Sequence, residues 1–133
     1  LGEKFGGSDI IIFRDFINRE KIHNYFGALD LSMIQYSEVP WANLAMPHKM
    51  AEGFAYGVPA IVRNFKERSE FIRKHKSGFV FSNSEPKMVA KAVSSFVDSN
   101  LIPKLSENAK KEFENKLCWE RQVDKLTEML DSL

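Results

Sequence analysis

Apolar positions along the chain change between two spacings, and this change predicts an alternation of strands and helices. Short apolar runs, rich in β-branched and aromatic residues, predict strands at residues 9–17, 30–36, 60–62 and 78–82. Apolar residues at helical spacing predict helices from residue 19 and at residues 48–56, 67–74, 86–99, 103–116 and 119–133. Strands that alternate with helices are typical of an α/β domain with a parallel sheet, here followed by C-terminal helices.

Particular residues predict where these helices begin and end. Asn18 can cap the helix that follows it, because its side chain can accept a hydrogen bond from a free backbone N–H group. Gly57 is a suitable C-terminal cap for the helix at residues 48–56, which Pro59 cannot continue. One stripe of the last helix is expected to be buried: Trp119, Val123, Leu126, Leu130 and Leu133.

Length, charge and cysteine content narrow the class of protein. The chain has 133 residues and a formal net charge of +1, which predicts one domain and gives no electrostatic reason to expect nucleic acid as a partner. Cys118 is the only cysteine, which excludes a disulfide within the chain and favours a cytoplasmic location. The histidines have no metal-ligand spacing, so no metal site is expected. No apolar run approaches the length of a membrane span.

The stretch "MPHKMAEGFAYGVPAIV" at residues 46–62 combines a loop, a short helix and a strand with charged residues at the helix start. Ligands of a parallel sheet bind beyond the carboxyl ends of its strands, and the free N–H groups of a helix start attract anions such as phosphate. Lys49 adds positive charge there, and Glu52 can accept two hydrogen bonds from adjacent hydroxyls, as ribose presents them. The alternative is that Lys49 and Glu52 form a surface pair worth a few tenths of a kcal/mol.

Pro47, Lys49, Glu52, Ala55, Gly57 and Pro59 match the pattern Pro-x-Lys-x-x-Glu-x-x-Ala-x-Gly-x-Pro. This pattern resembles the nucleotide-sugar signature of retaining glycosyltransferases with the GT-B fold. The flanking stretches agree in their order: "IIIFRDFINREKIHNYFGALDLSMIQYS" before it, then "RSEFIRKHKSGFVFS" and "LCWERQVDKL". The resemblance implies a Rossmann-like parallel sheet with helices on both faces, as a partial GT-B C-terminal nucleotide-sugar-binding domain over residues 1–133.

The resemblance also implies roles for individual residues. Glu52 matches the residue that holds the ribose hydroxyls of the donor. Pro47, His48 and Lys49 lie where the diphosphate and the sugar are held. Phe16 and Ile17 match a strand end whose backbone lies against the base.

The sequence departs from the family pattern at two positions and in its extent. Leu44 stands where many relatives have a first Glu that contacts the sugar, and Asp15 replaces a usual Gly. The family's C-terminal domain begins with two strands and a Gly-containing basic loop that this sequence lacks, and an N-terminal domain precedes it. The resemblance therefore assigns no catalytic residue, and the chain alone is expected to be inactive.

The function that the resemblance implies is transfer of a hexose-type sugar from a nucleoside diphosphate sugar, with retention at the anomeric carbon. The donor is a substrate, and no cofactor is expected. The implied partners are the nucleotide-sugar donor and a glycan or lipid-linked acceptor, and peripheral membrane association of the parent enzyme stays open. Two alternatives also stay open, a nucleotide-sugar 2-epimerase of GT-B architecture and a non-catalytic GT-B-like interaction module.

The strand predicted at residues 9–17 has no neighbour in the family's strand order, because its neighbours are the two absent strands. Unpaired backbone groups on both sides of an apolar strand are costly. The strand could pair with residues 30–36, with a second copy of the chain or with another chain. Association into a homodimer is the favoured expectation.

Overall fold

A three-stranded parallel sheet forms the centre of the protein. The computed structural model describes residues 11–36, 39, 42, 46–82 and 85–133. The strands are β1 (Ser32–Ile34), β2 (Ala60–Arg63) and β3 (Gly78–Phe81), in the order β1-β2-β3. Ile34 pairs with Val62, and Ala60 pairs with Gly78. The predicted parallel α/β sheet is confirmed, and β1 is shorter than the strand predicted at residues 30–36.

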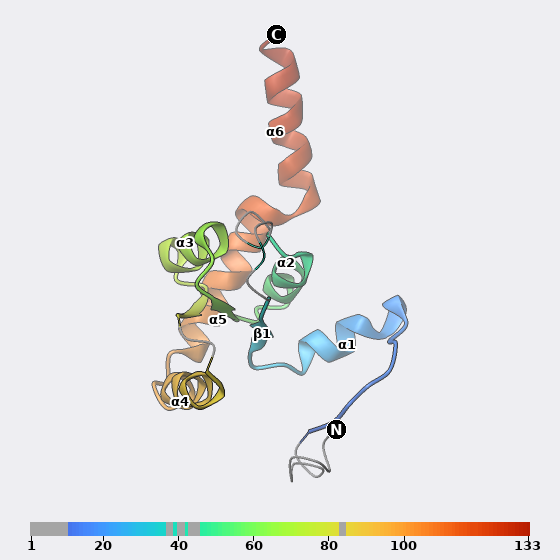
Figure 1. Ribbon diagram of the computed structural model, residues 1–133. Helices are drawn as coiled ribbons and strands as arrows, with labels where there is room; N and C mark the ends of the chain where they lie inside the picture. Colours follow the sequence, from blue (N-terminus) through green and yellow to red (C-terminus); the bar gives the residue numbers. More distant parts are fainter. Residues whose placement is uncertain (1–10, 37–38, 40–41, 43–45, 83–84) are drawn as a thin grey trace.

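Helices cover both faces of this sheet, as predicted (Figure 1). The helical elements of the chain are the 3-10 turn η2 (Arg19–Lys21), α1 (Ile22–Gly27), α2 (His48–Ala55), α3 (Lys66–His75), α4 (Pro86–Val97), α5 (Ile102–Glu112), the π-helical turn η4 (Phe113–Leu117) and α6 (Trp119–Asp131). Among the described residues, no helix is both long and apolar enough to cross a membrane.

The core has two layers, one on each face of the sheet. On one face, Ile34 and Val62 pack with Met50 and Phe54 of α2 and with Ile72 of α3. On the other face, strand and helix residues form a second cluster: Ile61, Phe81, Val89, Phe96 and Leu105. Alternate residues of a strand face opposite sides of the sheet. In β2, Ala60 and Val62 belong to the first cluster and Ile61 to the second, so this strand is apolar on both faces.

Local signals set the ends of the helices as expected. The side chain of Asn18 accepts a hydrogen bond from the backbone N–H of Glu20 at 3.4 Å. Gly57 has φ of 70°, and the N–H groups of Gly57 and Val58 bond to carbonyls in the last turn of α2, both at 2.9 Å. The left-handed conformation suits glycine, and this explains why α2 ends there.

The strand predicted at residues 9–17 is wrong for the part that the structure describes. Residues 11–17 have no regular secondary structure, and the side chain of Phe16 is 97% exposed. Residues 9 and 10 lie outside the described residues. An apolar run forms a strand only where a neighbouring strand completes its hydrogen bonds, and the described part of the sheet pairs β1 with β2 alone.

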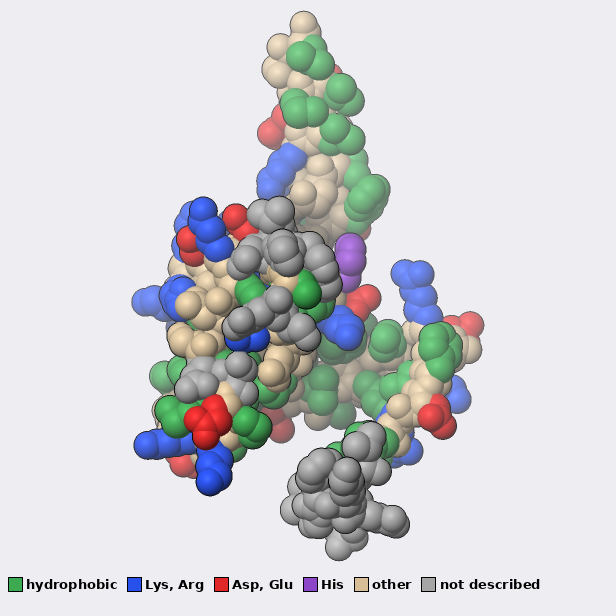
Figure 2. Space-filling model, viewed as in Figure 1, with side chains coloured by type: hydrophobic (Ala, Val, Ile, Leu, Met, Phe, Trp, Pro, Cys, Tyr) green, Lys and Arg blue, Asp and Glu red, His purple; other side chains and the backbone are tan. Residues whose placement is uncertain are grey.

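The helix predicted at the C-terminus is present, but the burial predicted for its apolar stripe is wrong. Trp119 is 76% exposed, and the other four stripe residues are exposed as well. Helix α6 leads away from the sheet (Figure 1), and hydrophobic side chains run along its surface (Figure 2). Periodicity predicts the helix, but burial also requires a surface for the stripe to contact.

Candidate functional site

The candidate site is the start of α2. In a strand–helix–strand unit with parallel strands, the helix runs back from the carboxyl end of one strand to the amino end of the next. Helix α2 ends just before β2, so its first residue lies toward the carboxyl edge of the sheet. Pro47 is the N-cap residue and provides no side-chain hydrogen bond. The first N–H groups of α2 therefore remain available to a ligand.

The charged side chains of α2 face away from the core. Met50, Gly53 and Phe54 are buried, whereas Lys49 and Glu52 on the other side of the helix are exposed. Neither Lys49 nor Glu52 has an ion-pair or hydrogen-bond partner among the described residues. The surface pair between them is therefore absent from this structure, and both groups can bind a ligand.

His48 lies between this charged face and a small cavity. The cavity has a volume of about 220 Å³ and is lined by Pro47, His48, Leu117 and Gln122, among others. Gln122 donates a hydrogen bond to the backbone carbonyl of Lys116, which holds it at the junction of η4 and α6. Leu117 and Gln122 were not predicted as site residues, because nothing in the sequence around them places them beside α2.

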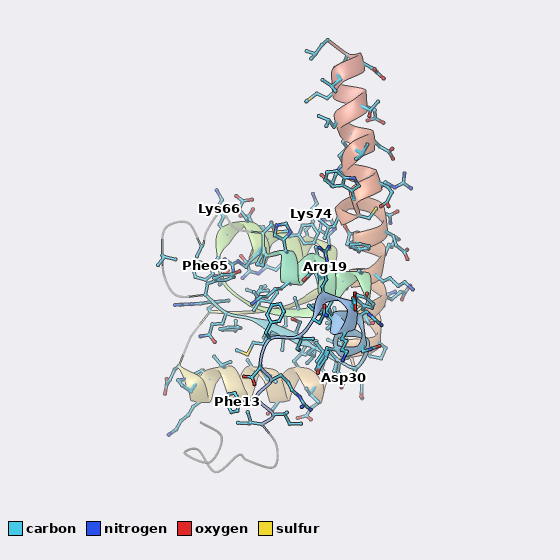
Figure 3. The ribbon with its side chains drawn as sticks, turned by 90° about the vertical axis from the view of Figure 1, so that its right-hand side faces the viewer. Phe13, Arg19, Asp30, Phe65, Lys66 and Lys74 are labelled. Carbon is cyan, nitrogen blue, oxygen red and sulfur yellow. The ribbon has the colours of Figure 1, made fainter. Side chains whose placement is uncertain are left out.

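A buried arginine supports the segment that leads into α2. The Arg68 side chain, in α3, is fully buried. Its guanidinium carbon lies 4.5 Å from the ring centroid of Tyr36 and 4.7 Å from that of Phe65. Its Nη2 atom donates a hydrogen bond to the carbonyl of Ala42. Phe65 directly precedes Lys66 at the start of α3 (Figure 3).

Arg68 thus connects three places at the carboxyl edge: the residues after β1, the residues after β2, and the loop that precedes α2. Burial lowers the pKa of its guanidinium, and the nearby Tyr36 opposes this with a smaller effect. The Nε and Nη1 atoms have no hydrogen-bond partner in the described part of the chain. In the sequence, Arg68 lies in the charged run "KERSE" and is indistinguishable from a surface residue.

Residues 1–115 match the family model of the glycosyl transferases group 1. The chain belongs to this family. The group 1 glycosyl transferase chain also resembles the solved structure of sucrose-phosphate synthase from Thermosynechococcus elongatus, with a TM-score of 0.76 and 16% sequence identity. At this identity the similarity shows the fold alone, and it confirms the GT-B resemblance seen in the sequence.

The similarity covers 98% of this glycosyl transferase chain and 33% of the synthase chain. The chain therefore spans about a third of the length of the solved structure that it matches. A search of curated proteins finds no match to the sequence.

The structure of this group 1 glycosyl transferase chain does not bring all the predicted site residues together. Pro47, His48, Lys49 and Glu52 lie on one helix start and its first turns. Phe16 and Ile17 lie on the segment without regular structure, which is apart from α2 in Figure 1. The strand end that would lie against the base is therefore not formed here.

Leu44, which stands where many relatives have a Glu that contacts the sugar, lies outside the described residues. In the described part of the chain, no group of three or more His, Cys, Asp or Glu side chains could hold a metal ion.

Proposed function

We propose that this chain forms the donor-binding half of a retaining glycosyltransferase, which uses a nucleoside diphosphate sugar. The observation that carries the proposal is the start of α2, where unpaired N–H groups, Lys49 and Glu52 face solvent together. A diphosphate would bind the N–H groups and Lys49, and the ribose hydroxyls would donate to Glu52. Membership of the family supports this assignment.

The chemistry of sugar transfer fits these groups. When the bond between the anomeric carbon and the diphosphate oxygen breaks, negative charge develops on the leaving diphosphate. Fixed N–H dipoles and an ammonium group stabilise such charge where it develops. The acceptor hydroxyl forms the new bond to the anomeric carbon, and its proton passes to the departing diphosphate. We assign the diphosphate contacts to the Lys49 ammonium group and to the backbone N–H groups of His48 and Lys49, which follow the N-cap Pro47. Retention of configuration and a hexose-type sugar are part of the proposal.

Substitution of Glu52 tests the nucleotide assignment. Glu52→Gln in the full protein is expected to weaken binding of a nucleoside diphosphate by roughly 1–3 kcal/mol, because a hydrogen bond to a charged acceptor is lost. Calorimetric titration measures this change. Glu70→Gln is a matched control, since Glu70 is an exposed glutamate on α3.

Equal affinity of the wild-type and Glu52→Gln proteins would contradict the assignment of Glu52 to ribose. Absence of nucleoside diphosphate binding by the wild-type protein would favour a non-catalytic interaction module instead.

A further inference from the structure

A second cavity lies toward the amino ends of the strands, whereas the start of α2 lies toward their carboxyl ends. It has a volume of about 500 Å³, within the range of pockets that hold a small molecule. Residues from α3, β3, α4 and α5 line it, with Lys76 and Gly78 at the amino end of β3. The proposed donor site lies at the carboxyl edge, so the two sites are distinct.

The inner wall of this cavity is apolar. It is formed largely by Ile72, Phe79, Phe96 and Leu105, from four different elements. Phe79 and Phe96 are in contact, with their ring centroids 5.6 Å apart. An apolar ligand body would gain free energy here by leaving water.

The mouth of the cavity is basic. Arg73, Lys76 and Lys104 line it, and no acidic residue does so among those described. Arg73 donates to the Asn64 side chain at 2.9 Å, and Lys104 contacts Glu107 at 2.8 Å. The Lys76 ammonium group has no such partner in the described residues, so it is available to an anion.

The backbone at Lys76 is fixed in an unusual conformation. Lys76 has φ of 48°, the left-handed conformation in which glycine is the usual residue after a helix. Its N–H bonds to the carbonyl of Ile72, and its carbonyl accepts from Asn108 of α5 at 2.8 Å. The root of the side chain is therefore held at the mouth of the cavity by contacts from two helices.

We propose that this cavity binds a soluble amphipathic carboxylate, whose apolar chain contacts the inner wall and whose carboxylate pairs with Lys76. Charge complementarity supports an acidic group, and the apolar wall supports a chain rather than a sugar. A soluble ligand is favoured over a lipid held in a membrane, because the mouth is mostly charged and polar, and Leu101 is the one exposed large apolar side chain among its described residues. This ligand site is independent of the proposed donor site.

Titration of the chain with laurate, below its micelle concentration, tests the proposal. Calorimetry is expected to show saturable binding to one site. Lys76→Glu should weaken binding at least tenfold, whereas Lys87→Glu, an exposed α4 lysine outside the cavity, should leave it unchanged. Dodecanol, which has the same chain without the charge, should bind at least tenfold more weakly than laurate.

Ser95→Trp provides a second variant that does not alter charge. Ser95 is exposed and lines the cavity, so an indole at this position should occupy the cavity and abolish laurate binding without removing a buried group. Equal laurate affinity in the wild-type and Ser95→Trp proteins would overturn the proposal. Binding to vesicles of phosphatidylglycerol without binding of free laurate would overturn it as well. Nucleoside diphosphate binding should be unchanged in Lys76→Glu, so failure of either proposed site can be told apart from failure of the other.

Discussion

Lys49 stands at a position where a helix usually disfavours positive charge. It lies in the first turn of α2, and no described acidic side chain pairs with it. Lys49→Ala is therefore expected to leave the free energy of unfolding unchanged or to raise it by about 0.3–1 kcal/mol. The same change should reduce binding of a nucleoside diphosphate far more than binding of the bare nucleoside. Thermal unfolding and calorimetry measure the two effects.

Lys87→Ala is the matched control for this prediction. Lys87 also occupies the first turn of its helix, α4, after Pro86. It should share the small effect on stability and leave nucleotide binding unchanged. Equal losses for diphosphate and nucleoside in Lys49→Ala would instead indicate a structural role.

Arg68 illustrates how a buried charge can position a site without touching a ligand. Its planar guanidinium lies against the rings of Tyr36 and Phe65 and bonds to Ala42. Arg68→Lys keeps the charge but loses the planar stacking, and it is expected to destabilise the fold by roughly 2–4 kcal/mol. Arg68→Met removes the charge at similar volume and should be better tolerated, since two guanidinium nitrogens without a hydrogen-bond partner among the described residues disappear with it.

Both Arg68 variants should weaken nucleoside diphosphate binding, because each loses the hydrogen bond that holds the loop before α2. Chemical denaturation and calorimetry test the two effects separately. Wild-type stability of the Arg68→Lys protein would show that the stacking contributes little.

At the scale of the elements, the close contact of β2 and β3 depends on a glycine. A Cβ atom at Gly78 would lie 2.0 Å from the carbonyl oxygen of Ala60, so the strands could not keep their pairing. Gly78→Ala is expected to lower the free energy of unfolding by about 3 kcal/mol or more, because a backbone atom must move. Denaturant unfolding measures this loss.

Gly27 provides the comparison for Gly78. A Cβ atom at Gly27, in α1, would meet no atom within 4 Å. Gly27→Ala should therefore be neutral or stabilise the protein by about 0.5–1 kcal/mol, as alanine favours a helix. A similar loss of stability in both variants would mean that the Gly78 contact is relieved elsewhere.

Elements whose signals are local could be predicted from the sequence, and those that depend on a distant partner could not. Helix α2 and its end at Gly57 follow from capping and backbone preference within a few residues. The segment at residues 11–17 and the stripe of α6 have the right pattern, but burial needs a surface that the sequence does not identify. In the site, Lys49 and Glu52 were predicted from their place at a helix start. Arg68 is defined by its burial and by its contacts with Ala42 and Tyr36, which lie 26 positions or more before it in the sequence.

At the scale of the whole molecule, exposed apolar surface is the feature that predicts association. The stripe of α6 and the segment at residues 11–17 both expose large side chains, with Leu130 56% exposed and Phe16 97% exposed. Contiguous apolar surface of this kind usually contacts another molecule. The chain is expected to self-associate at micromolar concentrations, as sedimentation velocity would show by an increase of the sedimentation coefficient with concentration.

Substitutions on the two sides of α6 refine this prediction. Leu126→Gln with Leu130→Gln should shift the chain toward monomer, whereas Glu128→Gln, which places the same side chain on the polar side of the helix, should not. A monomer at every concentration would contradict the prediction and leave the apolar stripe to another partner.

The position of α6 outside the core also affects local unfolding of the molecule. The two core clusters draw their residues from β1 to α5, and no residue of α6 is buried. An isolated helix of this length is marginal in water. Its amide hydrogens should therefore exchange with solvent through local fraying, at a much lower free energy than those of β2, which exchange only when the sheet opens. The free energy of unfolding thus describes the sheet and the helices packed on it, because the C-terminal helix is expected to melt before the rest.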